Sequence, residues 1–272
     1  TPARRVGRGP LTDPTDAEAA SGTSWASLGP CLPPGLVGIR PEPPRSLATP
    51  TRESQKPTPV KPTMGREDLL KLEAEDIELF RQPRWLNDNC IEYWIEHSLE
   101  DQVPATRRDD VGFICPSAMH MASFTSEEMA KELFEPLKLH IKELIIMPIN
   151  DNEAPEAVGG SHWALLVYER STNTFRLYDS IKSRSSGQAR AAMAKLSLAI
   201  GSQGATFEVE AHSPQQDNGY DCGAIVCLVA GLVLQSFLER KRKPVAEELS
   251  AITPSVTAKE RSQVMKRAQQ GL

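Results

Sequence analysis

The feature that most constrains the fold is an apolar segment that runs from Ala224 to Leu238. Arranged as a helix, it is apolar on nearly every side, so it has no face that suits water. It is also shorter than the roughly 20 apolar residues that cross a bilayer. We therefore expect a helix buried inside a globular domain, with the remaining elements packed around it.

Four other segments predict β-strands. Residues 144–149 form a short, nearly continuous apolar run, as expected for a strand covered on both faces. Residues 163–168 form a second such run, and residues 174–178 alternate between polar and apolar side chains. The polar residues 169–173 between them have the length and composition of a hairpin loop. Residues 206–210 predict one more short strand.

Further helices are indicated by capping signals and by helical spacing. Asn87 or Asp88 can cap a helix whose apolar residues include Ile91, Trp94, Ile95 and Leu99. Thr125-Ser126-Glu127-Glu128 has the pattern of a capping box at the start of a second helix. Residues 188–200 predict a third helix, ended by Gly201, and another is expected after Thr257. Strands and helices together predict an α+β domain.

The composition divides the chain into three parts. Residues 1–65 contain more than half of the 22 prolines and few large apolar side chains, so we expect this segment to be disordered. A docking peptide around Trp25 is a lesser alternative. We expect the α+β domain to occupy residues 66–240. Residues 241–272 are charged and predict a helical C-terminal extension.

Charge and cysteine content exclude several classes of protein. The formal net charge of −5 gives no reason to expect a nucleic-acid partner, and no apolar run predicts a membrane partner. The first ten residues lack the apolar core of a secretory signal. The five cysteines are odd in number, widely scattered and not spaced as zinc ligands. We expect reduced thiols, a cytoplasmic or nuclear location, and no metal or cofactor.

Cys222 stands directly before the buried helix, between Gly219 and Gly223. The helix dipole and the free N–H groups of a first turn stabilise a thiolate there, and the same N–H groups can hold an oxyanion. Gln216 lies six residues upstream and can add a side-chain donor. On its position alone, however, Cys222 fits an ordinary core cysteine better, because free cysteines are commonly core residues.

His162 and Asp179 flank the two strands of the predicted hairpin. His162 comes just before the first strand, after a pair of glycines, and Asp179 just after the second strand. If the strands pair, both side chains lie at the same open end, where the carboxylate can orient a general base. Taken singly, His162 could be a surface residue and Asp179 a turn residue. Together with Gln216 and Cys222 they make a complete nucleophilic site without a metal.

At this point the sequence resembles the Ulp/sentrin-type cysteine proteases, over about residues 66–238. The resemblance implies a papain-like α+β fold with a central mixed sheet and the nucleophile at the start of a buried helix. It implies a triad of His162, Asp179 and Cys222, with Gln216 at the oxyanion hole. It rests on four segments: Trp85-Leu86-Asn87-Asp88, Gly160-Ser161-His162-Trp163, Tyr178-Asp179-Ser180 and Gln215 to Gly223.

The same resemblance assigns the substrate. It implies that Trp85 and Trp163 enclose the C-terminal Gly-Gly of a ubiquitin-like modifier, with Asp88 also on the substrate side; core packing is the alternative for both tryptophans. Residues 148–152, 159–168 and 134–137 look closest to the deneddylating branch, which acts on the modifier of cullins. Residues 215–222 fit a SUMO protease equally well.

The leading hypothesis is therefore a thiol isopeptidase that cleaves after Gly-Gly, both on lysine conjugates and in modifier precursors. A second hypothesis, from another class, is a non-catalytic module that binds a ubiquitin-like protein; it would keep the tryptophans without needing all four catalytic residue types. A third is an acyltransferase built on the same triad, although no nucleotide-binding loop is recognisable.

Overall fold

A five-stranded mixed β-sheet lies at the centre of the protein in a computed structural model that describes residues 70–153, 160–241 and 243–271. The strands follow one another across the sheet in chain order. The outer pairs β1–β2 and β4–β5 are parallel, whereas β2–β3 and β3–β4 are antiparallel. The strands are β1 (Val111–Phe113), β2 (Leu144–Asn150), β3 (Trp163–Glu169), β4 (Thr174–Tyr178) and β5 (Thr206–Val209).

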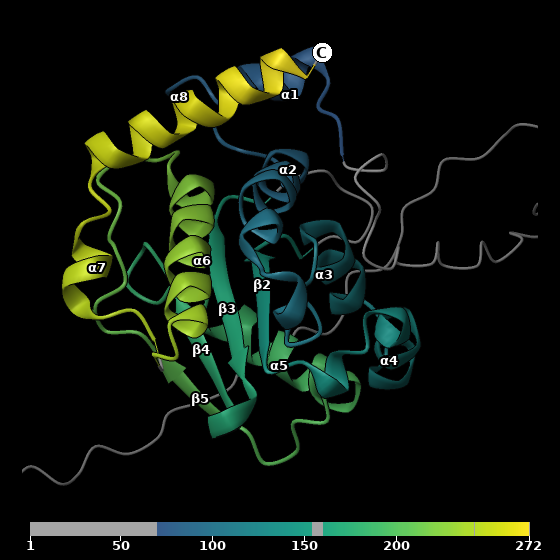
Figure 1. The fold of residues 1–272 in the computed structure, drawn as a ribbon. Coiled ribbons are helices and arrows are strands. Elements are labelled where there is room, and N and C mark those ends of the chain that lie inside the picture. Colours follow the sequence, from purple (N-terminus) through teal and green to yellow (C-terminus); the bar gives the residue numbers. More distant parts are fainter. Residues whose placement is uncertain (1–69, 154–159, 242, 272) are drawn as a thin grey trace, which may run out of the picture. The chain divides into compact units, whose positions relative to one another are not determined.

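Helices cover both faces of this sheet (Figure 1). The α-helices are α1 (Ala74–Leu79), α2 (Asp88–Ser98), α3 (Pro116–Ser123), α4 (Glu127–Phe134), α5 (Ser186–Ile200), α6 (Cys222–Leu238), α7 (Ala246–Ser250) and α8 (Pro254–Gln270). Short 3-10 helices connect them: η2 (Glu100–Gln102), η3 (Ala105–Arg107), η4 (Glu135–Leu137), η5 (Leu139–Ile141) and η6 (Arg170–Thr172). A mixed sheet flanked by helices confirms the predicted α+β class.

The core has two halves, one on each face of the sheet. Alternate residues of β2 and β3 point to opposite faces, as the pleat requires. Ile146 and Val167 pack with α2 and α6 on one face, whereas Ile145 and Leu166 pack with α3, α4 and α5 on the other. The apolar helix α6 is buried along most of its length, as its composition predicts.

The predicted hairpin is confirmed. Strands β3 and β4 pair in antiparallel register, with Leu165 opposite Tyr178 and Glu169 opposite Thr174. The turn between them is η6, followed by Asn173 in the left-handed conformation. Because β3 begins and β4 ends at the same edge of the sheet, the residues just outside the hairpin are brought together there.

Helix boundaries differ from the sequence-based prediction by a few residues. Asn87 caps α2, since its side-chain oxygen accepts a hydrogen bond from the Cys90 N–H at 2.9 Å. The cap of α4 is Ser126 and not Thr125 at the head of the expected capping box, because Ser126 Oγ accepts from Met129 N–H. Helix α8 begins at Pro254, before the expected start. Strand β1 was not predicted, because three residues carry too little periodicity.

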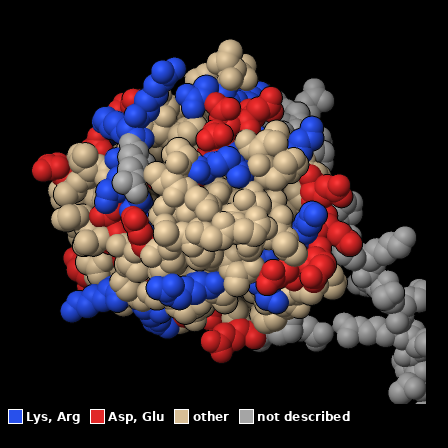
Figure 2. Space-filling view, turned by 90° about the horizontal axis from the view of Figure 1, so that it is seen from below, with Lys and Arg blue, Asp and Glu red and all other residues tan. Residues whose placement is uncertain are grey.

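Residues 1–65, including Trp25, lie outside the described residues. Among the described residues, no helix combines the length and apolar character needed to cross a membrane. Seen from below the view of Figure 1, the described surface has a largely uncharged centre, with acidic and basic side chains interspersed around it (Figure 2).

Candidate active site

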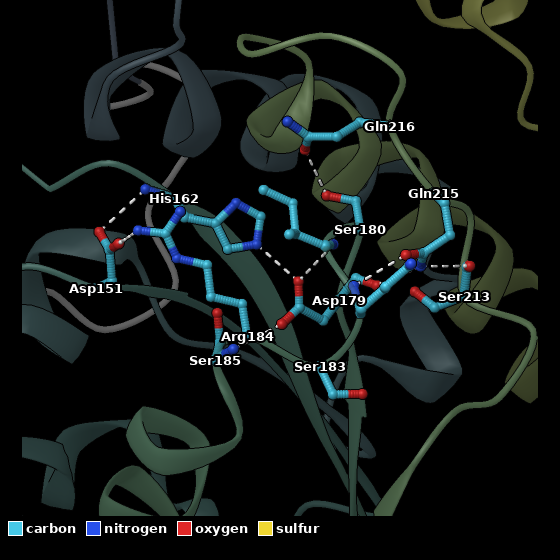
Figure 3. Close-up of polar contacts among 12 residues, drawn as sticks. Asp151, His162, Asp179, Ser180, Ser183, Arg184, Ser185, Ser213, Gln215 and Gln216 are labelled. Atoms are coloured by element: carbon cyan, nitrogen blue, oxygen red, sulfur yellow. Dashed lines mark hydrogen bonds and ion pairs between the residues drawn. The ribbon is translucent and has the colours of Figure 1, made fainter.

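The hairpin brings His162 and Asp179 into direct contact. His162 precedes β3 and Asp179 follows β4, and His162 Nε2 donates to Asp179 Oδ1 at 2.7 Å (Figure 3). Both residues are almost fully buried, with exposed fractions of 1% and 2%. A hydrogen bond between two groups so removed from water fixes the orientation of the imidazole ring.

The Asp179 carboxylate is held by backbone donors as well as by the histidine. Its Oδ1 accepts from the Ile181 N–H at 2.9 Å and its Oδ2 from the Ser185 N–H at 2.7 Å (Figure 3). Burial alone would raise the pKa of Asp179, but hydrogen bonds from His162 and from these two amides hold it below its usual range. Asp179 is therefore a preorganised anion facing the imidazole.

Asp151, which sequence reasoning did not single out, anchors the backbone of His162. Its Oδ1 accepts from the N–H groups of Ser161 and His162 at 2.5 and 3.0 Å. Its Oδ2 accepts from Ser161 Oγ. The same oxygen accepts from Arg184 Nη2 (Figure 3). Gly160 makes this turn feasible: its φ is +100°, and a Cβ there would lie 1.8 Å from the Asn150 side-chain oxygen.

Cys222 is the first residue of α6 and is 3% exposed. Its thiol interacts with the His162 imidazole. Nδ1, the ring nitrogen that Asp179 does not use, is buried. Burial lowers the pKa of His162, but hydrogen bonding and charge attraction from Asp179 and Cys222 outweigh it and raise this pKa to about 9.

Gly223 allows other segments to approach the first turn of α6. A Cβ at this position would lie 3.1 Å from Leu86 Cβ, 3.3 Å from Ile91 Cδ1 and 3.4 Å from Trp163 Cδ1. The segment that carries Trp85 and the start of β3 therefore press directly against the residue after the thiol. A side chain at 223 would separate them.

Gln216 lies in the loop before Cys222 with its side-chain amide fixed. Its Oε1 accepts from Ser180 Oγ at 2.7 Å (Figure 3), and its Nε2 donates to the Asn218 carbonyl at 2.7 Å. An amide nitrogen carries two hydrogens, so one N–H is left over for a further acceptor. The neighbouring Gln215 instead holds the end of β4, since its Nε2 donates to the Asp179 carbonyl at 2.9 Å.

The two tryptophans lie at the same end of the molecule as the thiol. Trp85 is 50% exposed and its indole N–H donates to the Gly219 carbonyl, three residues before Cys222. Trp163 is half-buried and donates to the Leu86 carbonyl at 2.9 Å. Asp88 is exposed at the first residue of α2. The structure thus gathers six of the seven residues named from the sequence around the start of α6, whereas no contact among the described residues links Asp88 to them.

The described residues contain no cluster of three or more His, Cys, Asp and Glu placed to hold a metal ion. The chemistry available from the contacts above is that of a thiol, a basic ring, an orienting carboxylate and amide donors. This set can form and break an acyl bond without a metal.

Comparison with known proteins settles the family. Residues 84–253 match the model of the Ulp1 protease family, C-terminal catalytic domain. The chain belongs to the Ulp1 protease family. It is a cysteine protease with the papain-like fold that the sequence predicts. Similarity to the mouse protein named sentrin-specific protease 8 is 34% identity over 71% of this chain and 86% of that protein.

Two further comparisons extend this one. The Arabidopsis thaliana protein named NEDD8-specific protease 1 is 32% identical over 64% of this chain and 76% of its own length. A solved structure, "SUMO protease Ulp1 with the catalytic cysteine oxidized to a sulfenic acid", superposes with a TM-score of 0.56 over 76% of this chain and 87% of that chain. At 19% identity this likeness concerns the fold alone.

Proposed function

We propose that the chain is an isopeptidase that cleaves after the C-terminal Gly-Gly of a ubiquitin-like modifier, with NEDD8 as the modifier. One observation carries the proposal: the buried His162–Asp179 pair faces a thiol at the start of a buried helix, next to two tryptophans that remain partly accessible. Curated relatives that carry the names NEDD8-specific protease and sentrin-specific protease 8 support the choice of modifier.

The proposed reaction uses the site as follows. The Cys222 thiolate attacks the carbonyl carbon of the terminal glycine, and the oxygen becomes an oxyanion held by the Cys222 N–H and by the remaining Gln216 N–H. The His162 imidazolium then protonates the leaving lysine nitrogen, and the acyl-enzyme forms. Water, deprotonated by His162, attacks the thioester and releases the modifier with a free carboxylate and regenerates the thiol.

The tryptophans supply selectivity for glycine. Trp85 and Trp163 each have their indole N–H engaged by a backbone carbonyl, of Gly219 and of Leu86 respectively, so neither ring turns freely. A slot between two fixed indoles admits a chain without side chains, which is what Gly-Gly provides. We assign the exposed Asp88 to contact with the body of the modifier, beyond the slot.

SUMO is the alternative modifier, because residues 215–222 suit either branch. The binding-module alternative is weaker, since a module without catalysis has no need for a carboxylate that orients a buried imidazole. For location we propose the cytoplasm or nucleus: the four described cysteines are all free thiols, as in a reducing compartment.

The test compares cleavage of NEDD8, SUMO and ubiquitin precursors by the wild-type chain with that by Cys222→Ala. We expect processing of the NEDD8 precursor by the wild type, and loss of turnover with retained NEDD8 binding in Cys222→Ala, because only the nucleophile is missing. Preferred cleavage of the SUMO precursor would reassign the modifier. Undiminished cleavage by Cys222→Ala would refute the mechanism itself.

A further inference from the structure

The guanidinium of Arg261 is buried although it comes from the C-terminal helix α8, which begins directly after the last residue of the family match. Helix α8 runs along α1 and against α6 (Figure 1), and the exposed fraction of Arg261 is 1%. Arginine is almost never fully buried unless its charge and its donors find partners. The partners of Arg261 therefore indicate why it is there.

Arg261 reaches two segments that are far apart in the sequence and adjacent at the site. An arginine side chain has five N–H donors in a rigid fork, and the five acceptors around this one match them. Nε donates to the Phe80 carbonyl at 3.2 Å, Nη2 to the carbonyls of Leu79 and Arg84 at 2.8 and 2.6 Å, and Nη1 to the Tyr220 carbonyl and Asp221 Oδ1 at 3.5 and 3.2 Å.

Two of these acceptors belong to the residues immediately before Trp85 and Cys222. Arg84 precedes Trp85, and Asp221 precedes Cys222. The Asp221 carboxylate extends the link, since its Oδ2 accepts from Asn218 Nδ2 at 2.9 Å and from Gln82 Nε2 at 3.5 Å. One cation and one carboxylate, both buried, thus join α8, the segment before Trp85 and the segment before Cys222.

We propose that Arg261 is a positioning residue of the active site. Arg261 fixes the distance between the glycine slot at Trp85 and the thiol at Cys222. Through this residue, helix α8 contributes to the geometry of the active site. This inference rests on the proposed function, because it concerns how the slot presents a substrate carbonyl to the thiol. Lysine cannot replace the arginine, because it has three donors on a flexible stem and not five in a plane.

The experiment measures labelling of the full chain by NEDD8 that ends in a C-terminal propargylamide, which forms an adduct with Cys222. The variants are Arg261→Met and Arg261→Lys, with Arg267→Met as the matched control. Arg267 is an exposed arginine on the same helix, and it bonds the end of α2 through the His97 carbonyl and Ser98 Oγ. Rate, half-saturating probe concentration and final labelled fraction are recorded separately.

We expect full final labelling by Arg261→Lys at a rate reduced about 10- to 100-fold, since a displacement near 1 Å at a reacting centre has an effect of that order. The half-saturating concentration of the probe should rise as well, because the Arg261 guanidinium also holds the segment before Trp85. Arg261→Met should be slower still, and Arg267→Met should match the wild type in rate. Circular dichroism establishes which variants are folded.

A purely structural role would lower only the labelled fraction and leave the rate of the folded molecules unchanged. That result in Arg261→Lys overturns the proposal, whether or not Arg261→Met folds. If NEDD8 does not label the wild type, the SUMO probe takes its place. If neither probe labels the wild type, the proposed function fails, and the positioning role, which rests on it, fails with it; labelling of the wild type with an unchanged rate in Arg261→Lys overturns the positioning role alone.

Discussion

Asp179 and Cys222 both favour the charged form of the His162 imidazole, and they do so against the effect of burial. A buried histidine without partners would be neutral at physiological pH. Here the carboxylate on one side and the sulfur on the other stabilise the imidazolium, which is the form that must protonate a leaving amine. The direction of the pKa shift therefore fits the proposed role of His162 as the general acid.

The first prediction concerns this titration. In an NMR titration of the His162 ring we expect a pKa near 9 in the wild type and a lower pKa in Asp179→Asn, because the amide is uncharged. Cys222→Ala should lower it as well, by removing the sulfur. An unchanged His162 pKa in both variants would mean that neither neighbour controls the ring.

At the scale of elements, the hairpin and the buried helix explain why much of the site could be predicted. The short polar loop made β3 and β4 pair, and the pairing forced His162 and Asp179 to one edge. The apolar helix had to be buried, which placed Cys222 at its protected start. In both cases one local pattern is enough to position a side chain that we propose as catalytic, so the sequence was sufficient.

The contact between α6 and the Trp85 segment gives the second prediction. Gly223→Ala adds a Cβ against Leu86 and Trp163 at 3.1 and 3.4 Å. We expect weaker substrate binding, with KM raised several-fold, because the slot must widen. Alanine stabilises a helix by about 0.5–1 kcal/mol relative to glycine. Crowding of the new Cβ, which typically costs about 1–3 kcal/mol of stability, should offset this gain.

Gly231→Ala is the matched control on the same helix. Its Cβ would meet only Leu99 Cδ2, at 3.4 Å, which is an ordinary contact. This variant should gain stability of about 0.5–1 kcal/mol with kinetics like those of the wild type. Thermal unfolding and precursor cleavage measure both effects. Equal KM values for the two variants would show that Gly223 is not needed for close packing of the slot.

At the scale of the whole molecule, contacts between segments that lie far apart in the sequence could not be predicted from the sequence. Arg261 bonds the Phe80 carbonyl across 181 residues, and four of its five acceptors are backbone carbonyls that any sequence would offer. No pattern in the residues 241–272 distinguishes Arg261 from the other charged residues there. Asp151 is similar, since it acts on the backbone N–H groups of Ser161 and His162. Only the assembled fold shows these partners.

The hydrogen bonds that hold Asp179 and Asp151 make the folded state sensitive to acid. Asp179 and Asp151 both have a pKa below the usual range: burial opposes the shift, but hydrogen bonds from His162 and from the amides of residues 161, 162, 181 and 185 outweigh it. A carboxylate whose pKa is depressed on folding stabilises the folded state above its unfolded pKa of about 3.9, and this contribution is lost as the pH falls through the folded pKa. The melting temperature should therefore fall steeply below about pH 4.

Asp179→Asn isolates one of these contributions. At pH 7 the variant should be less stable by about 1–3 kcal/mol, since a charged acceptor of buried N–H groups is lost. The difference from the wild type should shrink as the pH falls below about 4, because the unfolded wild-type chain then takes up a proton on Asp179 that the folded chain, with its lower pKa, takes up only at more acidic pH. Thermal melts followed by circular dichroism from pH 7 to pH 3 measure the two curves. Curves that stay parallel throughout would show that Asp179 is not the anion that its contacts require.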